Sequence, residues 1–312
     1  MAGRRGALGR AAEAASQNAV ALGYVSGWRL VRLLPERTAL RLFEQIGDSV
    51  YRRDGRSVQR LRGNLARVCP DLDEAGLDRL THDAVRSYLR YWTESFRLPS
   101  WPIEDVVRRT RTVDECILRD AHAKGGVVVA LPHMANWDWS GAWACATGMP
   151  LTTVAERLKP ERLYDEFVAY RASLGMEILA AGDPATFGTL VKRVEGGRLA
   201  CLLADRDLSR SGVEVRLCDE LARMPRGPAE LARRAGVPLI PATLHYDGPD
   251  LVVTFHDPVP HAEGEEGIVA MMQAVADRFT DAFRAHPVDW HMMQRVFVAD
   301  LGQAATTSRD GR

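Results

Sequence analysis

The sequence predicts an α/β protein: a central, mainly parallel sheet flanked by helices and preceded by an all-helical N-terminal region. Two observations carry this prediction. Residues 8–98 repeat apolar side chains at helical spacing without strand-like alternation, whereas residues 125–285 alternate short β-rich apolar runs with helical segments. The chain has 312 residues, of which 46% are hydrophobic, so it can bury a substantial core.

The N-terminal helices are predicted from apolar periodicity and from the residues that interrupt it. The first apolar stretch ends at Pro35, the next at Gly47 and the third before Pro70, because Pro and Gly end helices. Residues 72–98 indicate two more helices, and we expect no strand before residue 125.

The rest of the chain alternates between the two periodicities. Short apolar runs bounded by Gly or Pro predict strands at 125–132, 151–155, 177–180, 199–204, 237–244 and 250–255. Segments with helical spacing predict helices at 137–147, 160–174, 186–195, 227–235 and 265–285. This order favours parallel strands connected by helices on the faces of one sheet.

The charges cancel over the whole chain but not along it. The chain has 41 basic and 41 acidic residues. A net charge of zero argues against a nucleic-acid-binding protein that relies on an excess of positive charge. Residues 1–70, however, carry thirteen Arg and five acidic residues, a net +8, which leaves −8 for the remainder. In this segment Trp28, Leu30, Leu33 and Phe43 lie near arginines. Such helices either rest on an anionic membrane or pack on the α/β body.

Cysteine and histidine spacing argues against a metal site. The five Cys are far apart with no C-x-x-C pair, and no His spacing resembles a ligand set. The N-terminus is a poor signal peptide, and no uncharged apolar run approaches the roughly 18–20 residues that span a bilayer. We expect no metal, an intracellular location and no integral membrane segment.

The strongest candidate for chemistry is His133 with Asp138. His133 follows a predicted buried strand, which is where open α/β sheets place ligands. Asp138, five residues later, could accept a hydrogen bond from one ring nitrogen and leave the other as a base. Alternatively, Asn136 caps the next helix, Asp138 complements its dipole, and His133 only ends the strand.

Two charged clusters follow the neighbouring strands. Asp205, Arg206 and Asp207 come directly after one strand, so either carboxylate could orient His133 and the guanidinium could bind phosphate. Glu156, Arg157 and Lys159 follow another strand, with Arg171 on the next helix, and form a second phosphate-compatible group. Both clusters could instead be structural ion pairs or a charged helix start.

Other catalytic classes find little support in the sequence. There is no G-x-S-x-G nucleophile elbow, no P-loop, and no G-x-G-x-x-G after a strand. A covalent nucleophile or a bound nucleotide cofactor is therefore not expected.

Longer strings resemble one enzyme family. Residues 61–65, 131–138, 204–207 and 287–290 resemble, in this order, motifs of the bacterial lipid A biosynthesis acyltransferases, whose signature is H-x-x-x-x-D. Residues 153–161, 170–175, 206–215 and 224–229 resemble the actinobacterial branch, the phosphatidylinositol mannoside acyltransferases. The resemblance covers residues 20–298, nearly the whole chain.

The resemblance implies a reaction and a location. A fatty, palmitoyl-like acyl group would pass from acyl-CoA to a mannose hydroxyl of a phosphatidylinositol mannoside. Acyl-CoA would be a co-substrate, with no further cofactor. The enzyme would be peripheral, on an anionic membrane surface at the cytoplasmic face of the plasma membrane. We expect a single acyltransferase domain divided as follows: a membrane-facing helical region at 1–100, a catalytic α/β core at 120–300 within a domain spanning 1–300, and a loose tail at 301–312.

The family pattern also assigns roles to residues. The catalytic histidine falls on His133, its partner carboxylate on Asp205, where relatives carry Glu, and the signature acid on Asp138. Arg171 and Ser211 match positions implicated in binding acyl-CoA. The expected chemistry is direct transfer, with a neutral histidine, held by one of the two aspartates, removing the proton of the attacking hydroxyl.

Three alternatives remain open from the sequence. The protein could acylate another lysolipid acceptor, it could hydrolyse acyl-CoA as a thioesterase does, or it could bind lipid on the same fold without turnover.

Overall fold

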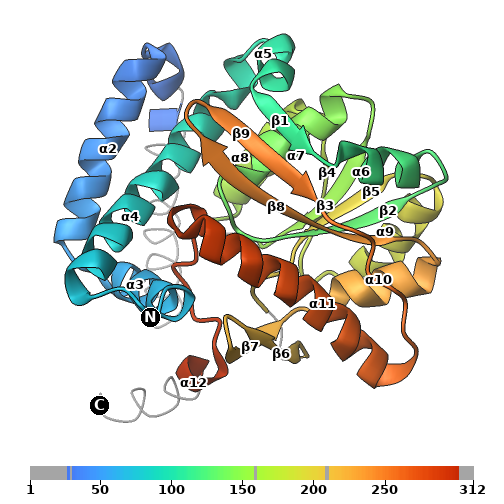
Figure 1. Cartoon of the computed structure of the whole chain (residues 1–312). Helices are drawn as coiled ribbons and strands as arrows, with labels where there is room; N and C mark the ends of the chain where they lie inside the picture. Colours follow the sequence, from blue (N-terminus) through green and yellow to red (C-terminus); the bar gives the residue numbers. More distant parts are fainter. Residues whose placement is uncertain (1–26, 29, 158–159, 208–210, 302–312) are drawn as a thin grey trace, which may run out of the picture.

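The structure is a computed structural model that describes residues 27–28, 30–157, 160–207 and 211–301 (Figure 1). The predicted tail beyond residue 301 and the apolar stretch before residue 27 lie outside the described residues.

Three helices form the N-terminal region, with bounds α2 (Glu36–Arg52), α3 (Arg56–Val68) and α4 (Glu74–Arg97). Residues 27–28 and 30–33 are also helical and precede α2. The prediction of two helices within 72–98 was wrong, because α4 is one helix. Asp73 caps it by accepting from the backbone N–H of Gly76 at 2.7 Å, and no breaker interrupts the segment after Gly76. A single turn, η1 (Leu98–Ser100), and α5 (Ile103–Arg108) follow.

The centre of the protein is a seven-stranded, mostly parallel sheet, as predicted. Its strands are β1 (Thr110–Val113), β2 (Val127–Leu131), β3 (Leu151–Ala155), β4 (Glu177–Ala180), β5 (Leu199–Leu203), β8 (Leu239–Asp247) and β9 (Asp250–Phe255). They lie in the order β1-β9-β8-β2-β5-β3-β4, and only the pair β8–β9 is antiparallel.

Helices cover both faces of the sheet (Figure 1). The remaining helical elements are α6 (Glu115–His122), α7 (Trp137–Ala146), α8 (Glu161–Ser173), α9 (Thr186–Glu195), α10 (Gly227–Ala235), α11 (Gly264–Ala285), η2 (Pro287–Asp289) and α12 (Val298–Leu301). Helices α9, α10 and α11 contact one another and pack on β5, β2 and β8, whereas α6 and α7 pack on β2, β3 and β9.

Three strands, β1, β6 and β7, and the short helices α5, α6 and α12 were not predicted. The expectation of no strand before residue 125 was wrong, because β1 pairs with β9 at the edge of the sheet. β1 has only four residues, and alternate positions are exposed, so it carries no apolar run that a sequence pattern could reveal. The hairpin of β6 (Val213–Leu217) and β7 (Glu220–Met224) turns through Cys218 and Asp219, both with positive φ. This turn geometry usually takes Gly or Asn.

The core is densest around β2, all five residues of which are buried. Gly126 precedes this strand, and a Cβ at that position would lie 1.9 Å from the carbonyl oxygen of Val194 in α9. The residue before β2 thus lies so close to α9 that only glycine fits there. This contact fixes the position of β2, and therefore of the loop that follows it, relative to α9.

Candidate active site

His133 and Asp205 form the centre of the candidate site. Nδ1 of His133 lies 2.6 Å from Oδ1 of Asp205, and the backbone N–H of His133 donates to Oδ2 at 2.9 Å. An ionised carboxylate only accepts, so we assign the proton to Nδ1, which leaves Nε2 as the acceptor nitrogen. Asp205 is fully buried, whereas the His133 side chain is 23% exposed. The pair therefore presents a base toward the surface.

The two residues meet because their strands are neighbours. Leu131 at the end of β2 pairs with Leu203 at the end of β5, and both strands run in the same direction. The loops after them leave from one edge of the sheet, which places His133 and Asp205 side by side. The side chain of Asp205 is long enough to reach the ring of His133.

A third donor fixes the buried carboxylate. The indole Nε1 of Trp290 donates to Oδ2 of Asp205 at 2.9 Å, and the ring stacks on Phe283 with centroids 4.2 Å apart. Met134 and Trp290 form an antiparallel bridge, so this segment is held against the His133 loop. Burial acts to raise the pKa of Asp205, but the charge of His133 and the three hydrogen bonds outweigh it, so the pKa lies below its usual value.

Asp138 does not hold the histidine. It accepts from Nε of Arg171 at 2.6 Å and from the hydroxyl of Tyr91 at 3.0 Å, and it is buried. The interpretation in which Asp138 orients the ring of His133 was wrong, because in the first turn of α7 its side chain faces α4 and α8. Burial acts to lower the pKa of Arg171, but the Asp138 carboxylate outweighs it and raises that pKa. Asp138 therefore fixes a charged arginine beside the site.

The start of α7 is anchored from α4. Asn136 caps α7 by accepting from the backbone N–H of Trp139 at 3.0 Å, as the alternative interpretation of this segment predicted. Its amide donates to Oε2 of the buried Glu94 at 3.1 Å, and the hydroxyl of Tyr246 donates to the same oxygen at 2.8 Å. Arg90 pairs with Oε1 at 2.7 Å. The loop that carries the histidine is thus tied to a buried polar network.

The remaining predicted binding residues lie around the same edge. Arg206 and Glu156 approach to 3.6 Å across the ends of β5 and β3. Arg157 and Ser211 are exposed, the latter just before β6. Lys159 lies outside the described residues. The structure therefore brings Arg206 and Glu156 into one ion pair and leaves Arg157 at the surface.

An apolar cavity of about 50 Å³ lies beneath the loop that carries His133. Its walls are side chains of β2, β5, β8 and β9 on one side and of α7 on the other, including Leu131 and Trp137. The rings of His133 and Trp137 lie 5.2 Å apart. The cavity therefore begins beside the histidine and extends into the core.

The comparisons with known proteins identify the family. The sequence model for bacterial lipid A biosynthesis acyltransferases matches residues 14–298. The chain belongs to this family. It is 41% identical over 283 residues to a phosphatidylinositol mannoside acyltransferase of Mycolicibacterium smegmatis, covering 90% of this chain and 92% of the relative. It is also 41% identical over 286 residues to a protein of the same name from Mycobacterium tuberculosis, covering 90% and 89%.

Within this acyltransferase family, some site residues escaped the sequence analysis. Trp290 lay in a recognised string, but nothing in the string indicates a hydrogen bond to Asp205. Tyr91 and Glu94 sit in an aromatic helix whose spacing shows only amphipathicity. No helix in the described part of the chain is long and apolar enough to cross a membrane, and no group of metal-binding side chains occurs there.

Proposed function

We propose that this acyltransferase moves a fatty acyl group from acyl-CoA to a mannose hydroxyl of a phosphatidylinositol mannoside. The observation that carries the proposal is the His133–Asp205 pair, in which a buried carboxylate holds Nδ1 at 2.6 Å and leaves Nε2 as a base on the exposed side. The acceptor follows from the names of relatives at 41% identity over nine-tenths of the chain.

Each proton and bond of the transfer can be assigned to the pair. Nε2 of His133 takes the proton from the acceptor hydroxyl as its oxygen attacks the thioester carbonyl. The tetrahedral intermediate expels the CoA thiolate, and the imidazolium returns the proton to that sulfur. Asp205 stabilises the imidazolium while it exists. Because the thiolate is a good leaving group, no covalent bond to the enzyme is needed.

The surroundings suit the two ends of acyl-CoA. The apolar cavity beneath the loop lies between the sheet and α7. It would accept the acyl chain if α7 moved away from the sheet. Arg171 and Arg206 lie on the same edge of the sheet and would pair with phosphates of CoA, together with Arg157. We propose roles in substrate binding for these residues, for Glu156 through Arg206, and for Ser211.

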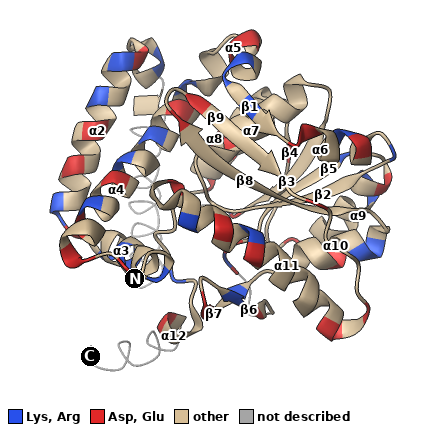
Figure 2. Cartoon of the chain, viewed as in Figure 1, with Lys and Arg blue, Asp and Glu red and all other residues tan. Residues whose placement is uncertain are grey.

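The N-terminal helices support a peripheral location on an anionic membrane at the cytoplasmic face. Trp28 is 4% exposed and packs on Phe96 at 5.1 Å, so part of this region packs on the body of the protein. Leu33, in contrast, is 80% exposed, and Leu42 in α2 is also exposed. Arg side chains are interspersed with acidic ones along α2 and α4 (Figure 2). Exposed leucines near arginines are the combination that anionic bilayers bind.

Point variants test the membrane contact better than deletion of residues 1–45, which would remove the buried Trp28. Leu33→Glu and Leu42→Glu should each reduce flotation with anionic liposomes, and added salt should weaken binding of the wild type. Leu221→Glu, at an exposed leucine of β7, is the control. Equal binding of all variants would contradict the proposed contact.

The transfer itself is tested with labelled palmitoyl-CoA, with and without mannosylated phosphoinositide, followed by thin-layer separation. His133→Ala should abolish the acylated glycolipid while the circular dichroism spectrum stays native. Release of free fatty acid without acceptor would indicate a thioesterase. Acylation of lysophospholipid alone would indicate a different acceptor. Full activity of His133→Ala would end the proposed mechanism.

A further inference from the structure

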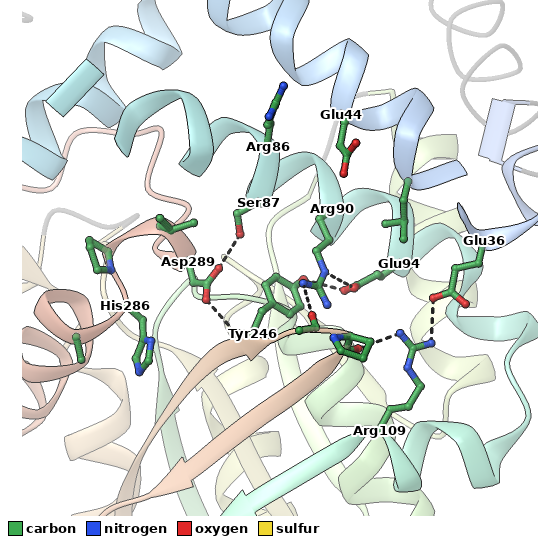
Figure 3. Close-up of a pocket in the computed structure, with 16 residues that line it drawn as sticks. Glu36, Glu44, Arg86, Ser87, Arg90, Glu94, Arg109, Tyr246, His286 and Asp289 are labelled. Carbon is green, nitrogen blue, oxygen red and sulfur yellow. Dashed lines mark hydrogen bonds and ion pairs between the residues drawn. The ribbon is translucent and has the colours of Figure 1, made fainter. Parts of the chain in front are cut away.

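A second, larger cavity lies beside the catalytic edge of the sheet. It has a volume of about 630 Å³, opens to solvent, and is lined by residues of α2, α4, the β8–β9 turn, the end of α11 and η2 (Figure 3). This volume falls within the range of small-molecule pockets, about 300–1,000 Å³. Its lining residues include neither His133 nor Asp205. It is therefore separate from the site that carries the proposed transfer.

The polar groups of this cavity are already held in place. Nε of Arg90 donates to Glu94 at 2.7 Å and Nη1 to the carbonyl oxygen of Gly248 at 2.9 Å, while the guanidinium lies 3.6 Å from the ring centre of Tyr246. Asp289 accepts from the backbone N–H of Tyr246 at 2.8 Å. A ligand would meet groups that need little reordering, which reduces the entropic cost of binding.

The charges around the cavity are mixed at close range. The lining carries four carboxylates and three guanidiniums, on Glu36, Glu44, Glu94, Asp289, Arg86, Arg90 and Arg109. Arg109 lies 3.1 Å from Glu36 and Arg90 lies 2.7 Å from Glu94, whereas Arg86 lies 2.6 Å from Asp48, outside the lining. Each of the three guanidiniums already has a carboxylate partner, so an anion would have to displace that carboxylate, and a cation at these carboxylates would be repelled by the guanidiniums. A hydroxyl both donates and accepts, so it can use both members of a pair.

The cavity also offers apolar contact. Leu40, Pro287 and Val288 contribute to its walls beside the charged groups. Such surfaces cover the C–H faces of a ring while its hydroxyls reach the charged pairs. We propose that this cavity binds a neutral, polyhydroxylated ring, that is, a sugar or a cyclic polyol.

An occupant of this cavity would be connected to the catalytic pair through two residues. Asp289 lines the cavity, and its backbone carbonyl accepts from the N–H of Ala135 at 2.9 Å in the His133 loop. The next residue, Trp290, donates to Asp205. Glu94 likewise lines the cavity and accepts from Asn136. A ring bound against Asp289 and Glu94 would therefore contact the residues that are hydrogen-bonded to the His133 loop.

Two sources could supply this chemistry: the glycan of a mannosylated lipid, or a free sugar or polyol. The first rests on the proposed function, and the second does not. Binding is measured on the full chain without acyl donor, so its failure and a failure of acyl transfer are distinguishable. The probes are methyl α-mannoside and myo-inositol by saturation-transfer NMR, then mannosylated phosphoinositide against phosphatidylinositol in the same detergent micelles.

The decisive variant is Leu40→Trp, which fills the cavity from α2. Ile46→Trp, at an exposed position of α2 outside the lining, is the matched control. We expect saturable binding of at least one probe by the wild type and by Ile46→Trp, and at least a tenfold loss in Leu40→Trp. If Leu40→Trp does not fold, Glu36→Gln, which removes one charged acceptor, should weaken binding by about tenfold. The proposal would be overturned if the wild type showed no saturable binding, or if Leu40→Trp and Glu36→Gln bound the probes as tightly as the wild type does.

Loss of lipid binding in Leu40→Trp would identify the glycan as the occupant, whereas loss confined to the free sugars would identify a soluble ligand. Both results support the cavity as a binding site for polyhydroxylated rings.

Discussion

The replacement of Asp205 by Asn is the sharpest test of the catalytic geometry. The change removes one charge and keeps the shape of the side chain. In the wild type, Oδ1 accepts from Nδ1 of His133, and Oδ2 accepts from the backbone N–H of His133 and from Trp290 at 2.9 Å each. An amide offers one acceptor and one donor end, so it cannot satisfy three donors.

The energetics of the two amide orientations decide the outcome. With its oxygen toward Nδ1, the amide NH₂ opposes two N–H donors and loses two hydrogen bonds. With the amide reversed, only the contact with Nδ1 is affected, and His133 can restore it by moving its proton to Nε2. The second arrangement is favoured, but it occupies the nitrogen that must act as the base. Returning the amide to the first orientation, which frees Nε2 as the base, leaves two buried N–H donors unpaired. At about 1–3 kcal/mol for each unpaired group, this costs about 2–6 kcal/mol. At about 1.4 kcal/mol per factor of ten, kcat/KM should fall by a factor of roughly 30 to 10⁴.

Initial rates of acyl transfer from labelled palmitoyl-CoA measure this loss. Asp207→Asn is the matched control, because it removes a charge from the same loop while the carboxylate of Asp207 accepts from the backbone N–H of Gly212 rather than from His133. Circular dichroism and the urea midpoint verify folding of both variants. If Asp205→Asn keeps more than about a tenth of wild-type kcat/KM, the assigned tautomer and the role of the pair are refuted.

Three further outcomes are expected. Gly126→Ala should lower the free energy of unfolding by about 1–3 kcal/mol or more, because its Cβ would lie 1.9 Å from a carbonyl oxygen of α9. Gly227→Ala, where the added Cβ would meet open space, should not lower it, and urea unfolding measures both variants. Hydrogen bonds from Arg193 lower the pKa of Glu177 from 4.5 to about 2, so its stabilisation is complete above pH 4.5 and lost as the pH falls through about 2. Glu177→Gln should therefore cost about 1 kcal/mol at pH 7 and little at pH 2. Trp290→Phe keeps the stacked ring but removes one donor to the catalytic carboxylate, and its kcat should fall about tenfold.

The sequence predicted those elements whose pattern is local. The strand before His133 is a continuous apolar run closed by Pro132, and the two loops that follow β2 and β5 meet because parallel neighbours end at one edge. β1 escaped prediction because its pairing with β9 depends on a segment about 140 residues later. The partner of Asp138 escaped for the same reason, since Arg171 is brought to it by tertiary packing.

The contrast between local pattern and tertiary contact also explains why the H-x-x-x-x-D string is informative although its His and Asp do not touch. His133 lies on the loop and turns toward Asp205, while Asp138, in the first turn of α7, faces Arg171 and Tyr91. The fixed spacing matters because Asn136 caps the helix between them, so the loop and the helix are set relative to each other. One short string thus supplies the proposed base on one side and fixes a charged arginine on the other. The spacing reflects two separate contacts that a single helix start must satisfy together.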